Sequence, residues 1–136
     1  MYRSSIDYAE DLVFSFEDES VIHPGFLQTI DYSGLRPPIS YQMNEFTAFC
    51  PFLGLPDTGI VCVDYILNKK LFELKTLKYY FISFTNVGNY QEDLTSRIFN
   101  DLTPLMVPEE FQIETLYSTR GGIGTTCTIN SNEQKY

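Results

Sequence analysis

Apolar and polar residues alternate along two stretches in the first half of the chain. Ile39, Tyr41 and Met43 alternate with polar neighbours. A period of two residues is typical of a strand with one buried face. We therefore expect one strand over residues 39–49 and a second over residues 58–67, where Ile, Val and Tyr residues are frequent.

The spacing of apolar residues becomes helical after the second predicted strand. Leu74, Leu77, Phe81 and Phe84 fall on one face of a helix, and we expect this face to pack on the core. Glu73 lies near the N-terminus of this helix, where a negative charge is favourable.

A second helix is predicted to begin near Tyr90, with acidic residues in its first turn. Pro104 cannot donate the hydrogen bond that a helix interior requires, so we expect it to end this helix early. Alternation returns over residues 111–117 and 123–129, which predicts two more strands joined by a glycine turn. The buried face of the second helix is expected to consist of Leu94, Ile98, Leu102 and Leu105.

Two strand pairs therefore flank two consecutive helices, in the order ββααββ. This order predicts an α+β fold in which an antiparallel sheet carries both helices on one face. A four-stranded sheet leaves two edge strands with unpaired backbone groups. Because such edges often pair with copies of the same chain, we expect a homo-oligomer.

The length of 136 residues and the apolar share of 43% suit a single domain with one core. Residues 1–38 contain several helix and strand breakers, and we expect them to form an extension that packs on this domain, with a candidate short strand at residues 11–16. No apolar run approaches the roughly 20 residues of a membrane span. The N-terminus lacks the apolar core of a signal peptide, so the expected location is cytoplasmic.

The net charge of −9 argues against a nucleic-acid partner. The nine Lys and Arg residues are scattered, whereas binding to a phosphate backbone needs clustered cations. The cysteines show no CxxC spacing, and the single histidine, His23, lies in a predicted surface loop. We therefore expect no disulfide scaffold and no metal site, and we expect Cys62 and Cys127 to be buried in the core.

Cys50 and Asp57 are the candidate catalytic residues. Cys50 ends the first predicted strand, and Pro51, Gly54 and Pro56 impose a rigid loop before Asp57. One short, stiff loop can bring a thiol and a carboxylate together, as a cysteine nucleophile with an acid–base partner requires. On these residues alone, a buried structural cysteine and a turn aspartate are the favoured interpretation.

Four motifs extend this picture. They are residues 46–57 around Cys50, the octet ELKTLKYY at residues 73–80, the triplet QED at residues 91–93 and the turn RGG at residues 120–122. In this order and spacing they resemble the NADPH-dependent 7-cyano-7-deazaguanine reductases, the nitrile reductases of queuosine biosynthesis. The resemblance implies the tunnelling fold, whose ββααββ units form rings, so a homo-pentamer or homo-decamer is expected.

The resemblance also implies a reaction, the four-electron reduction of a 7-deazapurine nitrile to a primary amine with two NADPH. The Cys50 thiolate would add to the nitrile carbon to give a thioimide. Asp57 would help to activate the thiol and would protonate the nitrogen.

The octet corresponds to the NADPH motif of that family. Lys75, Thr76 and Lys78 would bind the cofactor, and Arg120 would add a further positive charge to that site. Thr76 departs from the usual motif, which has serine or alanine at this position. Without the resemblance, lysines on a helix more often form a solvated face.

Glu92 is the expected substrate reader, because a carboxylate accepts two hydrogen bonds from a guanine-like edge. The resemblance places Gln91 and Glu73 at the substrate as well. Gln91 is the main departure, because histidine usually precedes this glutamate, and a glutamine side chain cannot carry a proton near neutral pH. Two alternatives therefore stay open: an amidinotransferase related to the archaeosine synthases, which lack the octet, and a tunnelling-fold protein that only binds a purine-like ligand.

Overall fold

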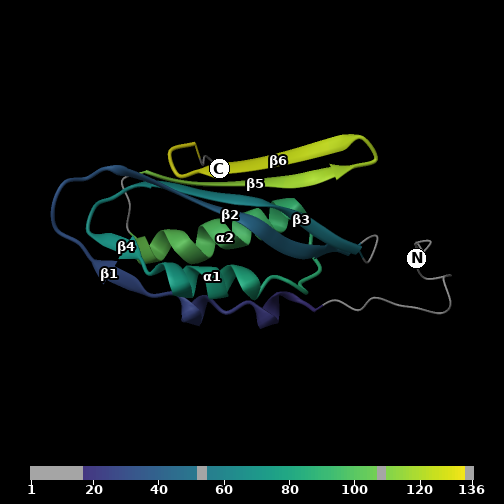
Figure 1. Ribbon diagram of the computed structural model, residues 1–136, viewed down its shortest axis with the longest axis horizontal. Coiled ribbons are helices and arrows are strands. Elements are labelled where there is room, and N and C mark those ends of the chain that lie inside the picture. The colour runs from purple at the N-terminus through teal and green to yellow at the C-terminus, as the bar shows by residue number, and fades with distance from the viewer. Residues whose placement is uncertain (1–16, 52–54, 107–109, 134–136) are drawn as a thin grey trace.

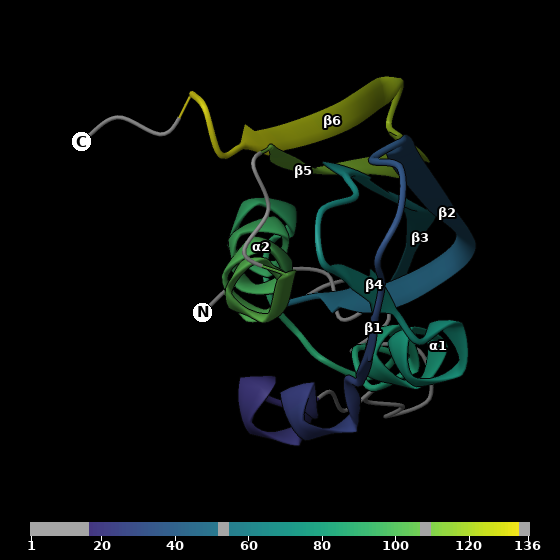
Figure 2. The ribbon, with the colours of Figure 1, turned by 90° about the vertical axis from the view of Figure 1, so that its left-hand side faces the viewer.

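One antiparallel sheet forms the centre of the protein, and two helices cover one of its faces (Figure 1, Figure 2). The predicted ββααββ order is confirmed, with a small additional sheet beside it. The central strands, in spatial order, are β2 (Pro38–Cys50), β3 (Leu55–Ile66), β5 (Phe111–Arg120) and β6 (Ile123–Asn130), and the helices are α1 (Leu74–Ile82) and α2 (Gln91–Met106).

The computed structural model describes residues 17–51, 55–106 and 110–133, without the side chain of Arg120. The candidate strand at residues 11–16 lies outside this part of the chain. In the part that is described, no helix is both long enough and apolar enough to cross a membrane.

An irregularity in β2 decides which way Cys50 faces. Met43 pairs with Val61 of β3, but Phe46 pairs with Gly59, so β2 contains one extra residue over this interval. A bulge of this kind reverses the alternation of side chains between the two faces of a strand. Odd-numbered Met43 therefore packs against the core before the bulge, and even-numbered Phe46 does so after it.

The hairpin between β5 and β6 is tight. Arg120 pairs with Ile123, which leaves Gly121 and Gly122 as a two-residue turn. Both glycines have positive φ, at 55° and 84°. Glycine adopts this conformation without steric cost, and a turn with positive φ at both central residues matches the twist of the strands that it joins.

The buried face of α1 differs from the prediction at one end. Leu77 and Phe81 are buried as expected, and Phe84 is fully buried although α1 ends before it. Leu74, which was predicted to face the core, is 56% exposed. It occupies the first turn of α1 beside a surface hollow next to β2, where no further strand covers it.

The end of α2 also differs from the prediction. Leu94, Ile98 and Leu102 are fully buried as expected, but Met106 is buried in place of Leu105, which is 38% exposed. The helix continues through Pro104 rather than ending early. Proline removes only one hydrogen bond in this last turn, and burial of Met106 in the core offsets that loss.

A second, two-stranded sheet joins β1 (Thr29–Asp31) to β4 (Lys70–Phe72). An ion pair between Lys70 and Asp31 spans the two strands. Upstream of β1, two short 3-10 helices at Glu19–Val21 and Pro24–Phe26 lie beside α1 (Figure 2). Ile22 and Leu27 belong to the same apolar cluster as the residues of the main sheet and helices, so this segment contributes to the core.

Candidate active site

A cavity of about 170 Å³ lies where β2 ends and α2 begins. It brings together four residues that the sequence singled out: Cys50, Asp57, Gln91 and Glu92. Other hollows are larger, including one of about 360 Å³ beside Asp64, but that one is lined by no cysteine. The chemistry of the lining, rather than the volume, therefore identifies the cavity beside Cys50 as the candidate active site.

Cys50 and Asp57 are positioned by the hairpin of β2 and β3. Cys50 pairs with Leu55, and Ala48 pairs with Asp57, so the two candidate residues lie two rows apart, on the same face of the sheet. Asp57 was expected at the end of a loop, but β3 begins at Leu55, and Asp57 lies inside the strand. A strand fixes this carboxylate more rigidly than a loop would, because the backbone of Asp57 pairs with Ala48 of β2.

The other two cysteines lie outside the cavity. Both were predicted to be buried in the core, but each is only partly buried. Cys62 alternates with the fully buried Val61 and Val63, so it lies on the sheet face opposite the helices. Burial, followed by the nearby Asp64 and Glu114 carboxylates, raises the pKa of the Cys62 thiol above its ordinary value of 9.0. Less thiolate at neutral pH makes Cys62 a weaker nucleophile.

The segment before α2 is bound to the end of β2, and this contact brings α2 to Cys50. The backbone N–H of Phe49 donates to the carbonyl oxygen of Val87 at 2.8 Å, and the N–H of Asn89 donates to the carbonyl oxygen of Phe49 at 3.3 Å. Gly88 N–H donates to the carbonyl of Glu17 at 2.8 Å on the other side. Residues 91 and 92 follow directly and reach the cavity.

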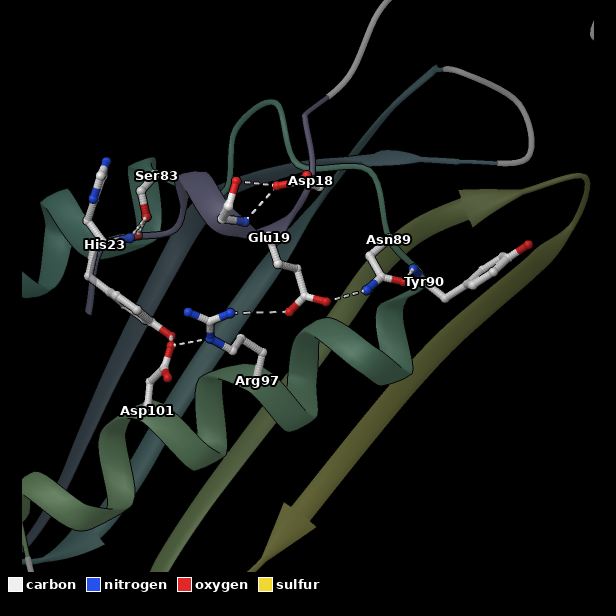
Figure 3. Close-up of polar contacts among 10 residues, drawn as sticks. Asp18, Glu19, His23, Ser83, Asn89, Tyr90, Arg97 and Asp101 are labelled. Atoms are coloured by element: carbon white, nitrogen blue, oxygen red, sulfur yellow. Dashed lines mark hydrogen bonds and ion pairs between the residues drawn. The ribbon is translucent and has the colours of Figure 1, made fainter. Parts of the chain in front are cut away.

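Side chains reinforce this arrangement from the N-terminal side (Figure 3). Asn89 Nδ2 donates to Glu19 Oε2 at 2.7 Å, and Glu19 Oε1 lies 3.5 Å from Arg97 Nη1. Arg97 Nε donates to Asp101 Oδ2 at 2.7 Å, and the same oxygen accepts from the Tyr80 hydroxyl at 2.8 Å. These contacts link the 3-10 helix Glu19–Val21, α1 and α2 to one another and to Asn89, which lines the cavity.

Gln91 is 7% exposed and bound to the sheet. Its Nε2 donates to the carbonyl and the hydroxyl of Thr115, both at 3.1 Å, and to the carbonyl of Thr125 at 3.3 Å. The Thr95 hydroxyl donates to the Gln91 carbonyl at 2.7 Å. The amide group of Gln91 therefore attaches the first turn of α2 to β5 and β6.

Glu92 is exposed and lines the cavity from the first turn of α2. A carboxylate is favourable at a helix N-terminus, so local helix physics alone also accounts for an acid here. Its position beside Cys50 agrees with the prediction that this carboxylate accepts hydrogen bonds from the N–H groups of a guanine-like ring.

The octet at residues 73–80 builds the start of α1. The Glu73 carboxylate is the N-cap and accepts from the backbone N–H groups of Thr76 at 2.8 Å and Lys75 at 3.1 Å. These bonds lower the pKa of Glu73 below its ordinary value of 4.5. Thr76 Oγ1 donates to the Glu73 carbonyl and accepts from Gln28 N–H, while Lys75 and Lys78 are exposed.

The structure does not bring the octet to the cavity. None of Glu73, Lys75, Thr76 and Lys78 lines the hollow beside Cys50. Figure 1 shows α1 beginning next to β4, toward the end of the sheet opposite the turn between β2 and β3. Lys78 instead lines a hollow beside the β2 edge. For Arg120, only the backbone is described, at the end of β5.

Tyr117 is a cavity residue that the sequence analysis missed. It pairs with Gly59 of β3, and a Cβ atom on Gly59 would lie only 2.9 Å from Tyr117 Cδ1 and 2.5 Å from the Leu116 carbonyl oxygen. A glycine is therefore needed where the Tyr117 ring crosses β3. The alternation of buried Ile113 and Thr115 along β5 was the available signal that Tyr117 shares their face.

Comparison with known proteins shows consistent matches. The model of the family described as QueF-like protein matches residues 56–136. Proteins from Thermotoga petrophila and Thermotoga maritima, each named NADPH-dependent 7-cyano-7-deazaguanine reductase, are 44% identical over 128 residues, which is 93% of this chain and 93% of each relative. A protein of the same name from Chloroherpeton thalassium is 44% identical over 114 residues, 82% of this chain and 98% of its own.

A solved structure shares the fold. The archaeosine synthase QueF-Like in the apo form superposes with a TM-score of 0.64 and 15% identity, covering 76% of this chain and all of its own. At this identity the likeness concerns the fold alone.

Proposed function

The chain belongs to the QueF-like family of NADPH-dependent 7-cyano-7-deazaguanine reductases, and we propose that Cys50, Asp57 and Glu92 carry that reaction here. The activity is the reduction of 7-cyano-7-deazaguanine to 7-aminomethyl-7-deazaguanine with two NADPH, in queuosine biosynthesis. The observation that carries the residue assignment is the meeting of these three side chains at one cavity. They offer a thiol, an acid–base group and a carboxylate acceptor for a guanine-like edge.

The first step needs only groups of this chain. Cys50 Sγ bonds to the nitrile carbon while Asp57 accepts the thiol proton and returns a proton to the nitrogen, which gives a neutral thioimide. When bound, NADPH would supply the hydride that this carbon needs. For the carbon–sulfur bond to break, Cys50 would leave as the thiol and take up one proton. Asp57, which lines the same cavity, is the group that we propose for the proton transfers.

Lys75, Thr76, Lys78 and Arg120 are the proposed NADPH-binding residues. Lys75 and Lys78 are three residues apart on α1 and exposed, and neither forms an ion pair with another residue in the described part of the chain. Two exposed cations on one helix face suit a cofactor phosphate, particularly in a chain with a net charge of −9.

The distance of this lysine face from the Cys50 cavity favours an active site shared between subunits. β2 and β6 each have one neighbouring strand in the described sheet, and the outer edge of β2 is occupied only near Phe49, by the segment before α2. Pairing of β2 with the β6 of a second copy would continue the sheet. The proposed assembly is a homo-pentamer or homo-decamer in which the octet of one subunit faces the cavity of another.

Covalent capture of the substrate tests the assignment of Cys50. Intact-mass measurement after mixing the protein with 7-cyano-7-deazaguanine, without NADPH, should show one adduct per chain. Cys50→Ala should abolish both the adduct and NADPH oxidation. Cys62→Ala is the matched control and should retain both, because Cys62 lies on the opposite face of the sheet. An adduct that persists in Cys50→Ala would disprove the assignment.

The same measurements separate the alternatives. An adduct that forms but consumes no NADPH, and that yields an amidine when ammonia is added, would favour the amidinotransferase function. Binding without any adduct would favour a protein that only holds a purine-like ligand. Both alternatives are tested because Gln91 stands in the place where histidine is usual.

A further inference from the structure

The Tyr117 hydroxyl is buried and forms no hydrogen bond with any residue that the structure describes. The two largely buried tyrosines Tyr80 and Tyr65 do have hydroxyl partners: Tyr80 donates to Asp101 at 2.8 Å, and the hydroxyls of Tyr65 and Tyr41 lie 3.2 Å apart. Leaving a buried donor unsatisfied costs free energy, so such groups are rare and call for an explanation.

The surroundings of Tyr117 point to a ligand as the missing partner. Tyr117 lines the cavity that contains Cys50, Asp57 and Glu92. Its ring is held in place, because it contacts Phe46 at a centroid distance of 6.4 Å and lies against the bare backbone of Gly59. A fixed donor at the wall of a substrate cavity is the arrangement that catalytic preorganisation uses.

The sheet pairing places Tyr117 near Asp57, the acid–base group of the proposed mechanism. Tyr117 pairs with Gly59, only two residues from Asp57 and on the same face of the sheet. Burial, followed by the Asp57 and Glu92 carboxylates, raises the pKa of Tyr117 above its ordinary value of 10.0. The phenol therefore stays protonated and remains a donor at neutral pH.

We propose that the Tyr117 hydroxyl donates a hydrogen bond to the nitrile nitrogen of the substrate while Cys50 adds to the nitrile carbon. This inference rests on the proposed function. In the addition, the bond from sulfur to carbon forms, one π bond between carbon and nitrogen breaks, and its electron pair moves to the nitrogen. The thiol proton passes to Asp57, and Asp57 supplies the proton that the nitrogen finally carries. Tyr117 keeps its own proton and stabilises the negative charge that develops on the nitrogen.

Tyr117→Phe removes the hydroxyl and keeps the ring. Removal of a preorganised donor of this kind typically slows the assisted step by about 10²–10³-fold, so thioimide formation should slow by a factor in this range in stopped-flow absorbance. Binding of 7-deazaguanine, which has the same ring without the nitrile, should be unchanged in calorimetry. The thermal midpoint of the free protein should stay the same or rise, because an unsatisfied buried hydroxyl is lost.

Tyr65→Phe is the matched control, because it deletes another buried tyrosine hydroxyl in the same sheet, away from the cavity. It should form the thioimide at the wild-type rate. If Tyr117→Phe instead weakens 7-deazaguanine binding and leaves the saturating rate of addition unchanged, the hydroxyl contacts the ring and the inference is wrong. Equal rates in Tyr117→Phe and wild type overturn the inference alone, whereas no adduct in the wild type overturns the proposed function together with it.

Discussion

Gln91 illustrates what the sequence reveals about a single residue and what it leaves open. The resemblance implies that it lies at the substrate together with Glu92, and in the structure both residues line the cavity beside Cys50. Its hydrogen bonds to Thr115 and Thr125 depend on strands that lie more than twenty residues away in the chain, so no local pattern could predict them. The same reason explains why Tyr117 was missed, since its role depends on Gly59 and Asp57 across a sheet pairing.

Gln91→His tests whether the glutamine limits the reaction. One imidazole N–H can replace the donor to the Thr115 and Thr125 carbonyls, and the other nitrogen can then serve the cavity as an acid or base. Groups of this kind contribute about 10²–10⁴-fold to a rate, although Asp57 provides part of that contribution already. We expect faster NADPH oxidation in steady-state assays between about pH 6 and about pH 9, with the rate of thioimide formation little changed.

Gln91→Leu is the matched control for this substitution. It removes the donor without adding a proton carrier and leaves the Thr115 and Thr125 carbonyls short of a partner, which should lower the free energy of unfolding by about 1–3 kcal/mol. Its NADPH oxidation should not exceed that of the wild type. A histidine variant that is slower than the wild type at every pH would show that Gln91 imposes no deficit.

At the scale of elements, periodicity predicted the type and order of all four central strands and both helices. It failed at positions that depend on geometry between elements. The bulge between Met43 and Phe46 appears only in the pairing of β2 with β3, yet it determines that Cys50 faces the helices. The exposure of Leu74 and the burial of Met106 likewise depend on where the sheet ends beneath each helix.

Glu73 provides a test at this scale, because the structure shows it as the N-cap of α1. Its pKa in the folded protein is lowered, so its contribution to stability is complete above the unfolded value near 4.5 and is lost as the pH falls through the lower folded value. Glu73→Ala should therefore lower the thermal midpoint at neutral pH, and the difference should shrink below about pH 4. Thermal unfolding followed by circular dichroism at both pH values measures this.

Glu73→Asp is the control, since aspartate is a strong N-cap residue and keeps a carboxylate at the start of the helix. It should retain most of the wild-type stability. A thermal midpoint of Glu73→Ala that matches the wild type at neutral pH would show that the cap contributes nothing. A separate rise in the substrate KM of either variant would support the predicted contact of Glu73 with the substrate.

At the scale of the whole molecule, the residues proposed for catalysis and those proposed for NADPH binding lie on two separate surfaces of one chain. The cavity with Cys50 lies at the turn between β2 and β3, and the octet lies at the start of α1 near β4 (Figure 1). One chain therefore separates the residues proposed for chemistry from those proposed for NADPH. The ring that we propose, closed through the outer edges of β2 and β6, would resolve this separation if each octet faces the cavity of a neighbour.

Subunit mixing tests this arrangement directly. Cys50→Ala lacks the nucleophile, and the double variant Lys75→Ala/Lys78→Ala lacks the cofactor-binding lysines, so each should be nearly inactive alone. If each site combines Cys50 from one subunit with the lysines of another, random mixing in equal amounts leaves about one quarter of the sites intact, and activity should recover to about that level.

Mixing Cys50→Ala with Asp57→Asn is the control and should recover nothing, because both residues belong to the same cavity of one chain. Native mass spectrometry verifies that mixed pentamers or decamers have formed. Mixed rings without recovered activity would place the lysines and Cys50 of each site in a single chain, and a fully active monomer in light scattering would exclude the ring altogether.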